Sequence, residues 1–257
     1  MMPIAREPDD TLYKQRWDIP LPASRKQPWD AAGRPQAHYD YQQAMGMLTG
    51  VIPNEDARWQ RMQDYYFNCI SDNDRSVENV LAELDNLGMT DNTIIIFTAD
   101  HGELGGAHGM SGKGSTAYHE QNNVPFILYH PAIAGGKTCK AVTAHNDIVP
   151  TILAMTGADK QLAKSVTDHL HGHDVSRVLN DPQAASPDAI RKNGALYCFG
   201  MWAFMDANWL KSIAAAAKSS QEMTLDTLPR PEQRKRSNIR TVYDGRYKYS
   251  RYFNSKQ

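Results

Sequence analysis

Two short apolar runs dominate the middle of the chain. Residues 93–98 read TIIIFT and residues 124–131 read VPFILYHP. Because β-branched and aromatic residues favour strands, and because the apolar residues are consecutive, the runs predict strands buried on both faces. The stretch between them is polar and rich in glycine. The pattern therefore predicts two neighbouring buried strands that hold one long polar loop.

A helical spacing precedes the first of these strands. Between residues 56 and 87, apolar side chains recur at helical steps at Tyr66, Cys69, Ile70, Val77, Leu81 and Leu84. Steps of three and four place them on one face of a helix, and Gly88 is suited to its C-terminal cap. A shorter helix is predicted over residues 148–155, with Asp147 as its cap and Pro150 in its first turn.

The rest of the chain predicts more strands and one irregular region. Residues 140–146 (KAVTAHN) and 194–204 (GALYCFGMWAF) favour strands. Near the end, IRTVY and RYKYSRYF flank Asp244-Gly245, the signal of a two-residue hairpin turn. Residues 1–57 are rich in proline and predict an irregular surface excursion. We expect one domain over residues 1–257, with 58–257 as its core portion.

Composition excludes several function classes. Lysine and arginine number 28 against 29 acidic residues, so charge gives no reason to expect a nucleic acid or an anionic membrane as partner. No apolar run has the length of a membrane span. No signal peptide opens the chain, which predicts a cytoplasmic protein if these residues are complete and otherwise leaves localisation open. Cys69, Cys139 and Cys198 lack the spacing of a metal site and are expected to be free thiols or small apolar residues.

The groups capable of chemistry lie where the first strand ends. Asp100 and His101 follow the strand directly, and the glycine-rich loop after them carries His108 and Lys113. A carboxylate and a neutral imidazole can bind one divalent cation, and a lysine ammonium can bind an anion beside it. This combination favours a site for a sulfate or phosphate ester. The alternative is that Asp100 begins an ordinary turn and His101 is a hydrogen-bonded loop residue.

The same residues carry a specific resemblance. The run TADHGELGGAHGMSGKG resembles the metal-binding segment in the C-terminal part of the sulfatases, within the alkaline phosphatase superfamily. The matching positions are Asp100, His101, Leu104, Gly105, His108, Gly109 and Lys113. The resemblance implies that Asp100 and His101 bind a calcium-like divalent ion in a loop at residues 98–114. It implies sulfate binding for Lys113, and leaves His108 open between loop stabilisation and catalysis.

The flanking segments extend this resemblance from about Tyr65 onward. HNDIVPTILAMTG resembles the family's Asp-x-x-Pro-Thr helix, and IRTVYDGRYKYSRYF resembles its late strand. The implied fold is α/β, an alkaline-phosphatase-like sandwich of helices around a mostly parallel or mixed sheet, incomplete at both ends. The implied substrate is a small sulfate ester or a sugar sulfate, and the sequence says nothing about the oligomeric state.

One part of the family pattern is missing from these residues. The sulfatase nucleophile is a formylglycine made from Cys or Ser in a Cys/Ser-x-Pro-x-Arg motif, which does not occur here. We therefore expect a metal-dependent sulfuric ester hydrolase by family that is incomplete and catalytically impaired as this chain alone. The alternatives are a phosphoester or phosphonate hydrolase of the same superfamily, and a non-catalytic scaffold or binding protein.

The resemblance places a histidine-rich segment, HLHGHD, on a loop after the Asp-x-x-Pro-Thr helix, where the family usually reads Gly-x-Asp-Leu. His169, His171 and His173 alternate along it, which raises the hypothesis of zinc binding. No second ligand cluster at zinc-finger spacing accompanies them, so structural or rim histidines are favoured. Asp147 and His145 are likewise expected to be structural.

Overall fold

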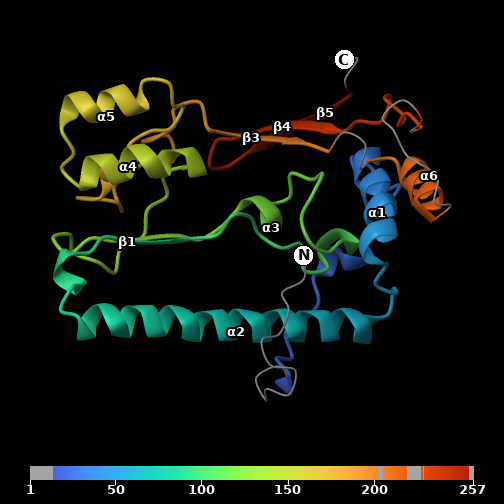
Figure 1. Cartoon of the computed structure of the whole chain (residues 1–257), viewed down its shortest axis with the longest axis horizontal. Coiled ribbons are helices and arrows are strands. Elements are labelled where there is room, and N and C mark those ends of the chain that lie inside the picture. The colour runs from blue at the N-terminus through green and yellow to red at the C-terminus, as the bar shows by residue number, and fades with distance from the viewer. Residues whose placement is uncertain (1–13, 202–204, 219–226, 228, 255–257) are drawn as a thin grey trace. The chain divides into compact units, whose positions relative to one another are not determined.

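The computed structural model describes residues 14–201, 205–218, 227 and 229–254. Figure 1 shows the course of the chain. Its helices are α1 (Gln36–Thr49), α2 (Asp56–Asn86), α3 (His119–Asn122), α4 (Ile148–Met155), α5 (Lys160–Thr167) and α6 (Ala207–Lys218). Its strands are β1 (Ile95–Thr98), β2 (Phe126–Tyr129), β3 (Ala195–Gly200), β4 (Asn238–Tyr243) and β5 (Lys248–Phe253).

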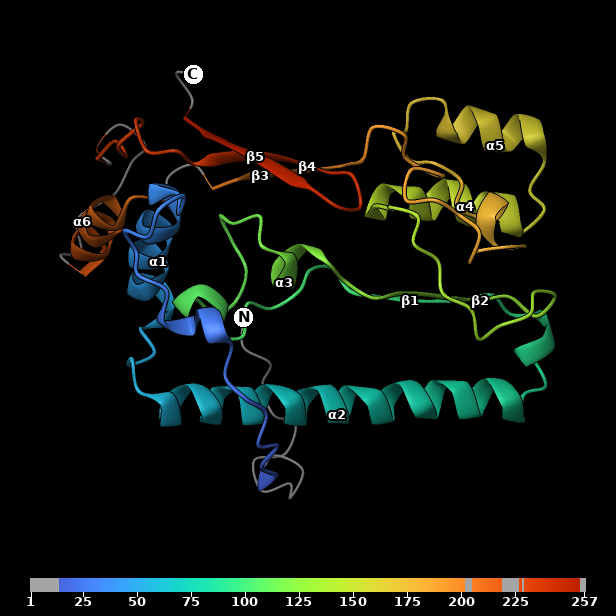
Figure 2. The same cartoon turned by 180° about the vertical axis from the view of Figure 1, so that it is seen from behind.

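These elements belong to two compact units. Unit 1 takes its described residues from Met1–Leu128, Phe199–Asn238 and Tyr252–Gln257. Unit 2 consists of Tyr129–Cys198 and Ile239–Arg251. Strands β1 and β2 form a two-stranded sheet, and β3, β4 and β5 form a three-stranded sheet in that order (Figure 2). The α/β class is thus confirmed, but the strands that we expected in a single sheet form two small ones.

The predicted pair of strands is present, although neither strand is fully buried. Phe97 of β1 is 37% exposed and Ile127 of β2 is 60% exposed. Each strand has one neighbour in the described sheet, and successive side chains point to opposite faces. Every second side chain of β2 is exposed, and Phe97 of β1 is exposed as well, so the expectation of burial on both faces was wrong.

The long helix α2 forms as its spacing predicted, but it buries a different set of residues. Trp59, Gln63, Asp64 and Asn68 are its buried side chains. Ile70 and Leu81, two members of the predicted apolar stripe, are 46% and 40% exposed. The helix ends as expected, with Gly88 in the left-handed region at φ 64°.

Helix α1 corrects the expectation of an irregular region up to residue 57. It begins after Pro35 and ends at Gly50, whose φ of 81° suits glycine. Ala37, Tyr41 and Ala44 are buried on one of its faces. The prolines up to Pro35 predicted an irregular backbone for the whole of residues 1–57. The stretch that begins at residue 36 has no proline within the helix and forms a regular helix.

The core of unit 1 lies between α1 and the loop that follows β1. Its fully buried cluster consists of Ala37, Tyr41, Leu104, Met110 and Met205. Helix α6 packs against α1 on the other side (Figures 1 and 2). None of the described helices combines the length and the apolar character of a membrane span.

Unit 2 confirms α4 and the hairpin and corrects two details. Residues 140–144 form no strand, because the backbone of this stretch bonds elsewhere, as Val142 N does to Pro187 O (2.8 Å). The hairpin connection runs over residues 244–247 and is longer than the predicted two-residue turn. The Asp244 carboxylate accepts from Arg246 N (2.8 Å) and Tyr247 N (2.6 Å), which stabilises this wider turn. Strand β3 also forms, while residues 202–204 of its predicted range lie outside the described residues.

Candidate metal and anion site

The candidate site lies on the loop that joins β1 to α3. Strand β1 ends at Thr98, so the chain delivers Asp100 and His101 directly at the strand's carboxyl end. The loop then returns, and Lys113 comes back beside them. The backbone is closely packed at both ends of this path. A Cβ added to Gly102 would overlap the carbonyl oxygen of Glu120, and one added to Gly114 would overlap the ring of Tyr41.

Three of the predicted residues converge at the imidazole of His101. Its Nδ1 lies 2.9 Å from the Gly102 carbonyl oxygen. A carbonyl only accepts, so Nδ1 carries the proton and Nε2 presents its lone pair. Lys113 Nζ lies 2.5 Å from Nε2, and Asp100 Oδ2 lies 3.1 Å from it. A carboxylate, a lone pair and an ammonium thus meet at one point.

Glu103 braces the loop. One carboxylate oxygen, Oε1, accepts from Gly105 N (3.0 Å) and from Gly112 N (2.5 Å), which ties the start of the glycine-rich turn to its end. Leu104 N also donates to Gly112 O (3.0 Å). Since this oxygen already accepts two backbone hydrogens, Glu103 shapes the loop that carries Lys113.

Gln121 fastens both ends of the loop, and sequence reasoning missed it. Its side-chain Oε1 accepts from Gly114 N (2.9 Å), its Nε2 donates to Gly114 O (3.1 Å), and its backbone oxygen accepts from Gly102 N (2.7 Å). The residue is 3% exposed. No sequence motif indicates Gln121, because its bonding partners are brought to it only by the fold of the loop.

Tyr41 holds the backbone of Lys113 from α1. Its hydroxyl donates to the Lys113 carbonyl oxygen. Burial, and to a lesser extent the Glu103 carboxylate, raises the pKa of Tyr41 to about 12, so the hydroxyl keeps its proton. The Lys113 backbone is therefore fixed on both sides, while its ammonium remains at the surface.

The contacts that the structure gives His108 are with residues other than Asp100, His101 and Lys113. Its Nδ1 donates to Gln27 Oε1 (2.7 Å), and its ring stacks on Tyr118 with centroids 3.5 Å apart. Arg34 Nη2 donates to its carbonyl oxygen (2.7 Å). Burial lowers the pKa of His108, which favours the neutral ring. These contacts are those expected of a loop-stabilising residue.

A buried histidine, His38, contacts the hydroxyl of Tyr118. His38 Nδ1 is 3.1 Å from the Tyr118 hydroxyl, and its Nε2 is 2.8 Å from the Tyr252 hydroxyl. The side chain is 2% exposed. Burial, with the nearby Arg34 and His108 adding to it, lowers the pKa of His38 to about 3. His38 is therefore neutral at ordinary pH and connects α1 to the residue on which His108 stacks.

The donor set can be tested against a divalent cation. Asp100 oxygen and His101 nitrogen are suitable ligands, and the two atoms lie 3.1 Å apart, which is close enough for both to bind one ion. In the described part of the chain, no group of three or more His, Cys, Asp or Glu side chains could surround an ion. The two donors fit part of a metal shell, since calcium takes about six to eight oxygen ligands.

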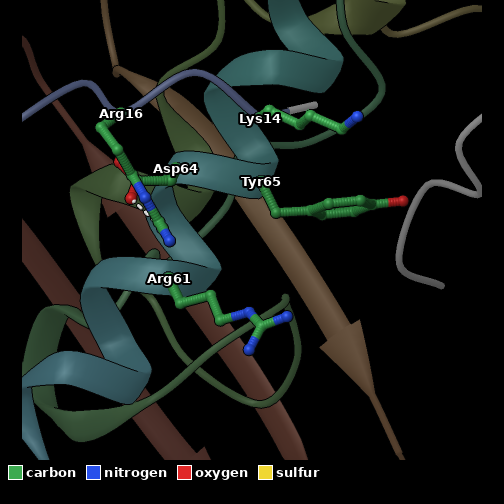
Figure 3. Close-up of a pocket in the computed structure, with 5 residues that line it drawn as sticks. All are labelled: Lys14, Arg16, Arg61, Asp64 and Tyr65. Carbon is green, nitrogen blue, oxygen red and sulfur yellow. Dashed lines mark hydrogen bonds and ion pairs between the residues drawn. The ribbon is translucent and has the colours of Figure 1, made fainter. Parts of the chain in front are cut away.

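A separate pocket of about 290 Å³ lies between α2 and residues 14–16. Figure 3 shows its lining residues, Lys14, Arg16, Arg61, Asp64 and Tyr65, and the ion pair between Arg16 Nη1 and Asp64 Oδ2 (2.8 Å). Its lining includes none of the predicted site residues. The pocket and the candidate site on the loop therefore share no residue.

Asp147 is structural, as expected, but its contacts differ from the predicted cap of α4. Its carboxylate accepts from Ala144 N (2.8 Å) and His173 N (2.7 Å) and pairs with Arg191. The side chain is 1% exposed. It thus closes the short turn ahead of α4 and anchors the histidine-rich segment. His173 is the member of that segment whose backbone makes this contact.

Comparison with known proteins identifies the family. The model of the sulfatase family matches residues 22–158, just over half of the chain. The chain belongs to the sulfatase family. It is 29% identical over 149 residues to an endo-4-O-sulfatase of Bacteroides thetaiotaomicron, covering 57% of this chain and 28% of that protein. It is 30% identical over 155 residues to an ulvan-active sulfatase of Formosa agariphila, covering 58% and 29%.

The fold of this sulfatase-family chain is similar to that of larger solved structures. It aligns with a phosphonate monoester hydrolase from Silicibacter pomeroyi at a TM-score of 0.71 and 20% identity, covering 95% of this chain and 44% of the other. A putative sulfatase of Bacteroides thetaiotaomicron aligns at 0.62 and 19%, covering 91% and 42%. The alkaline-phosphatase-like fold is thereby confirmed, and the chain spans about three tenths of the length of the first curated relatives it matches.

Proposed function

We propose that the loop of residues 98–114 is the metal- and anion-binding part of a sulfuric ester hydrolase site. In this proposal Asp100 and His101 hold a divalent cation, calcium, and Lys113 binds the oxygens of the sulfate group. The observation that carries it is the meeting of Asp100 Oδ2 and Lys113 Nζ at His101 Nε2. Family membership supports the same reaction class.

The charges of these three residues suit the two parts of the ligand. A carboxylate and the lone pair of a neutral imidazole favour a cation, which supplies charge neutralisation at the ester oxygens when it is bound. The compact ammonium of Lys113 favours an anion at the same point. Tyr41, Glu103 and Gln121 fix the backbone around Lys113, and the Lys113 ammonium contacts His101 Nε2 from there.

The proposed substrate is a sulfate ester carried on a sugar or another small molecule. Among the relatives, one is described as an N-acetylglucosamine-6-O-sulfatase, and one solved neighbour holds D-glucosamine-2-N,6-O-disulfate. The proposal names no nucleophile within residues 1–257, because the Cys/Ser-x-Pro-x-Arg motif does not occur among them. We therefore propose that this chain alone binds the ester and turns it over poorly.

A phosphonate or phosphate monoester is the second candidate substrate. The likeness of fold to the phosphonate monoester hydrolase favours it. Both ester classes present a small oxyanion to a cation and an ammonium, so the residues of the loop suit either.

Binding of two probes tests the proposal and separates the candidates. The chain would be titrated with 4-nitrophenyl sulfate and with 4-nitrophenyl phenylphosphonate, a phosphonate monoester, each in the presence of calcium. We expect tighter binding of the sulfate ester, and about a tenfold loss in the Lys113→Gln variant. Lys137→Gln, at an exposed position outside the loop, is the matched control. Tighter binding of the phosphonate monoester would favour the second candidate. No Lys113-dependent binding of either probe would favour a non-catalytic scaffold instead.

A further inference from the structure

Unit 2 contains a positively charged pocket that the proposed hydrolase site does not use. Its volume is about 460 Å³, and its polar lining residues are His173, Arg177, Arg191, Lys192 and Asn193. No carboxylate belongs to the lining that the structure describes. His173, a member of the histidine-rich segment, lines this pocket and has no role in the proposed hydrolase site.

Arg191 is a fixed donor in this pocket. Its Nε donates to Asp147 Oδ2 (3.0 Å) and its Nη2 donates to Asp147 Oδ1 (2.5 Å). The arginine side chain is 9% exposed and the aspartate 1%. These bonds use one edge of the guanidinium and leave the hydrogens of Nη1 outside them. The buried carboxylate therefore orients Arg191 without using all of its donors.

Arg177 is anchored in the same manner by backbone. Its Nη2 donates to the carbonyl oxygens of Ala189 (2.8 Å) and Ile190 (2.9 Å), and these bonds leave Nε and Nη1 outside them. A planar guanidinium held at one edge keeps its remaining donors in a fixed direction, which lowers the entropy lost when an anion binds. Two arginines of this pocket are thus pre-oriented.

The carboxylates near the pocket lie outside its lining. Asp147 is paired with Arg191, and the Asp174 carboxylate accepts from Ser176 N (2.8 Å). Asp188 is exposed, accepts from Ser186 Oγ (2.5 Å) and lies in electrostatic reach of Lys192. Asp147 thus offsets Arg191 and Asp188 offsets part of the Lys192 charge, but none of these carboxylates lines the pocket, whose wall presents Arg177, Arg191 and Lys192.

We propose that this pocket binds the oxyanion group of a small acidic ligand, with Arg177, Arg191 and Lys192 as its donors. Sulfate, phosphate and carboxylate share the required chemistry, since each presents oxygens to a guanidinium fork. The volume lies within the range of about 300–1,000 Å³ typical of small-molecule sites and exceeds the size of a bare ion. A larger polar molecule that carries the oxyanion would fit this volume, and the Asn193 amide offers it a donor and an acceptor.

The test is a titration of the chain followed by amide chemical shifts. The probes are glucose 6-sulfate, inorganic sulfate and glucose, so that the anion and its carrier are separated. We expect shifts at Arg177, Lys192 and Gly194 with the two anions, larger affinity for glucose 6-sulfate, and none with glucose. Lys192→Gln should weaken binding about tenfold, because it removes one charged donor and no hydrogen bond of the fold.

Two controls make the outcome decisive. Lys164→Gln removes an exposed cation on α5 of the same unit, and Lys113→Gln removes the cation of the proposed hydrolase site. Neither should change binding in unit 2. Equal weakening by Lys192→Gln and Lys164→Gln would overturn the proposal, because binding would then reflect overall charge. Shifts confined to the 98–114 loop, or no shifts at millimolar probe, would overturn it as well.

Discussion

The loop of residues 98–114 and the β1–β2 sheet beside it differ in how deeply their side chains are buried. In the loop, Leu104 and Met110 are 1% and 0% exposed, and Glu103 bonds backbone across the turn. In the sheet, Ile127 is 60% exposed and Phe97 37%. The polar, glycine-rich segment is thus the more tightly packed of the two. Burial and backbone bonding, more than apolar composition, fix the position of the candidate site.

The largest effect is expected from shortening the buried leucine of the loop. Leu104→Ala should reduce the free energy of unfolding by about 3 kcal/mol, because it opens a cavity in the core of unit 1. Ile127→Ala on the sheet should cost less than about 1 kcal/mol, since that side chain is mostly exposed. Denaturant unfolding measures both. Equal losses at the two positions would remove the contrast between loop and sheet.

A smaller loss is expected when the loop loses its glutamine. Gln121→Ala leaves Gly114 N and the Thr116 hydroxyl without their buried partner, at a cost of about 2 kcal/mol. Hydrogen exchange at Gly114 should rise, while exchange in β1 and β2 stays as it was. Gln43→Ala, at an exposed position on α1, is the matched control. Unchanged exchange at Gly114 would show that Gln121 does not hold the loop.

The free energy of unfolding should fall with falling pH because of His38. Its folded pKa of about 3 lies below the unfolded value, so the unfolded chain binds the proton first as pH falls. The His38 contribution is therefore present above about pH 6.5 and is lost progressively toward about pH 3. Between about pH 7.5 and pH 5 the loss is about 2 kcal/mol.

The variant His38→Gln isolates this pH dependence. It should be less stable than the wild type at neutral pH and should show a flatter fall toward acid, as measured by denaturant midpoints across that range. The His130→Gln variant, at a half-buried position near the end of β2, should keep the wild-type slope. Identical slopes for His38→Gln and the wild type would contradict the assigned pKa.

Sequence reasoning found the residues with chemical character but not those that hold them. Asp100, His101 and Lys113 stood out because their types and spacing match a known motif, and the structure brings all three together. Gln121 and Tyr41 left no local signal, because their partners lie on other elements or across the loop. Contacts between distant segments are set by packing, which residue types alone do not specify.

The same limit explains the errors in the fold. The periodic spacing of α2 and the apolar runs of β1 and β2 predicted elements correctly, since both patterns are local. Their burial was predicted wrongly, because burial depends on which neighbours cover a face. Helix α1 was missed because the prolines before it dominated the pattern of residues 1–57.

Calorimetric titration with calcium tests the central claim most directly. If Asp100 and His101 hold the cation beside Lys113, then Asp100→Asn and His101→Ala should each weaken calcium binding about tenfold or more. Lys113→Gln should strengthen it, because an ammonium 2.5 Å from His101 Nε2 repels a cation. Asp91→Asn, at an exposed position before β1, should change nothing. Weaker calcium binding by Lys113→Gln, or unchanged binding by Asp100→Asn, would contradict the account.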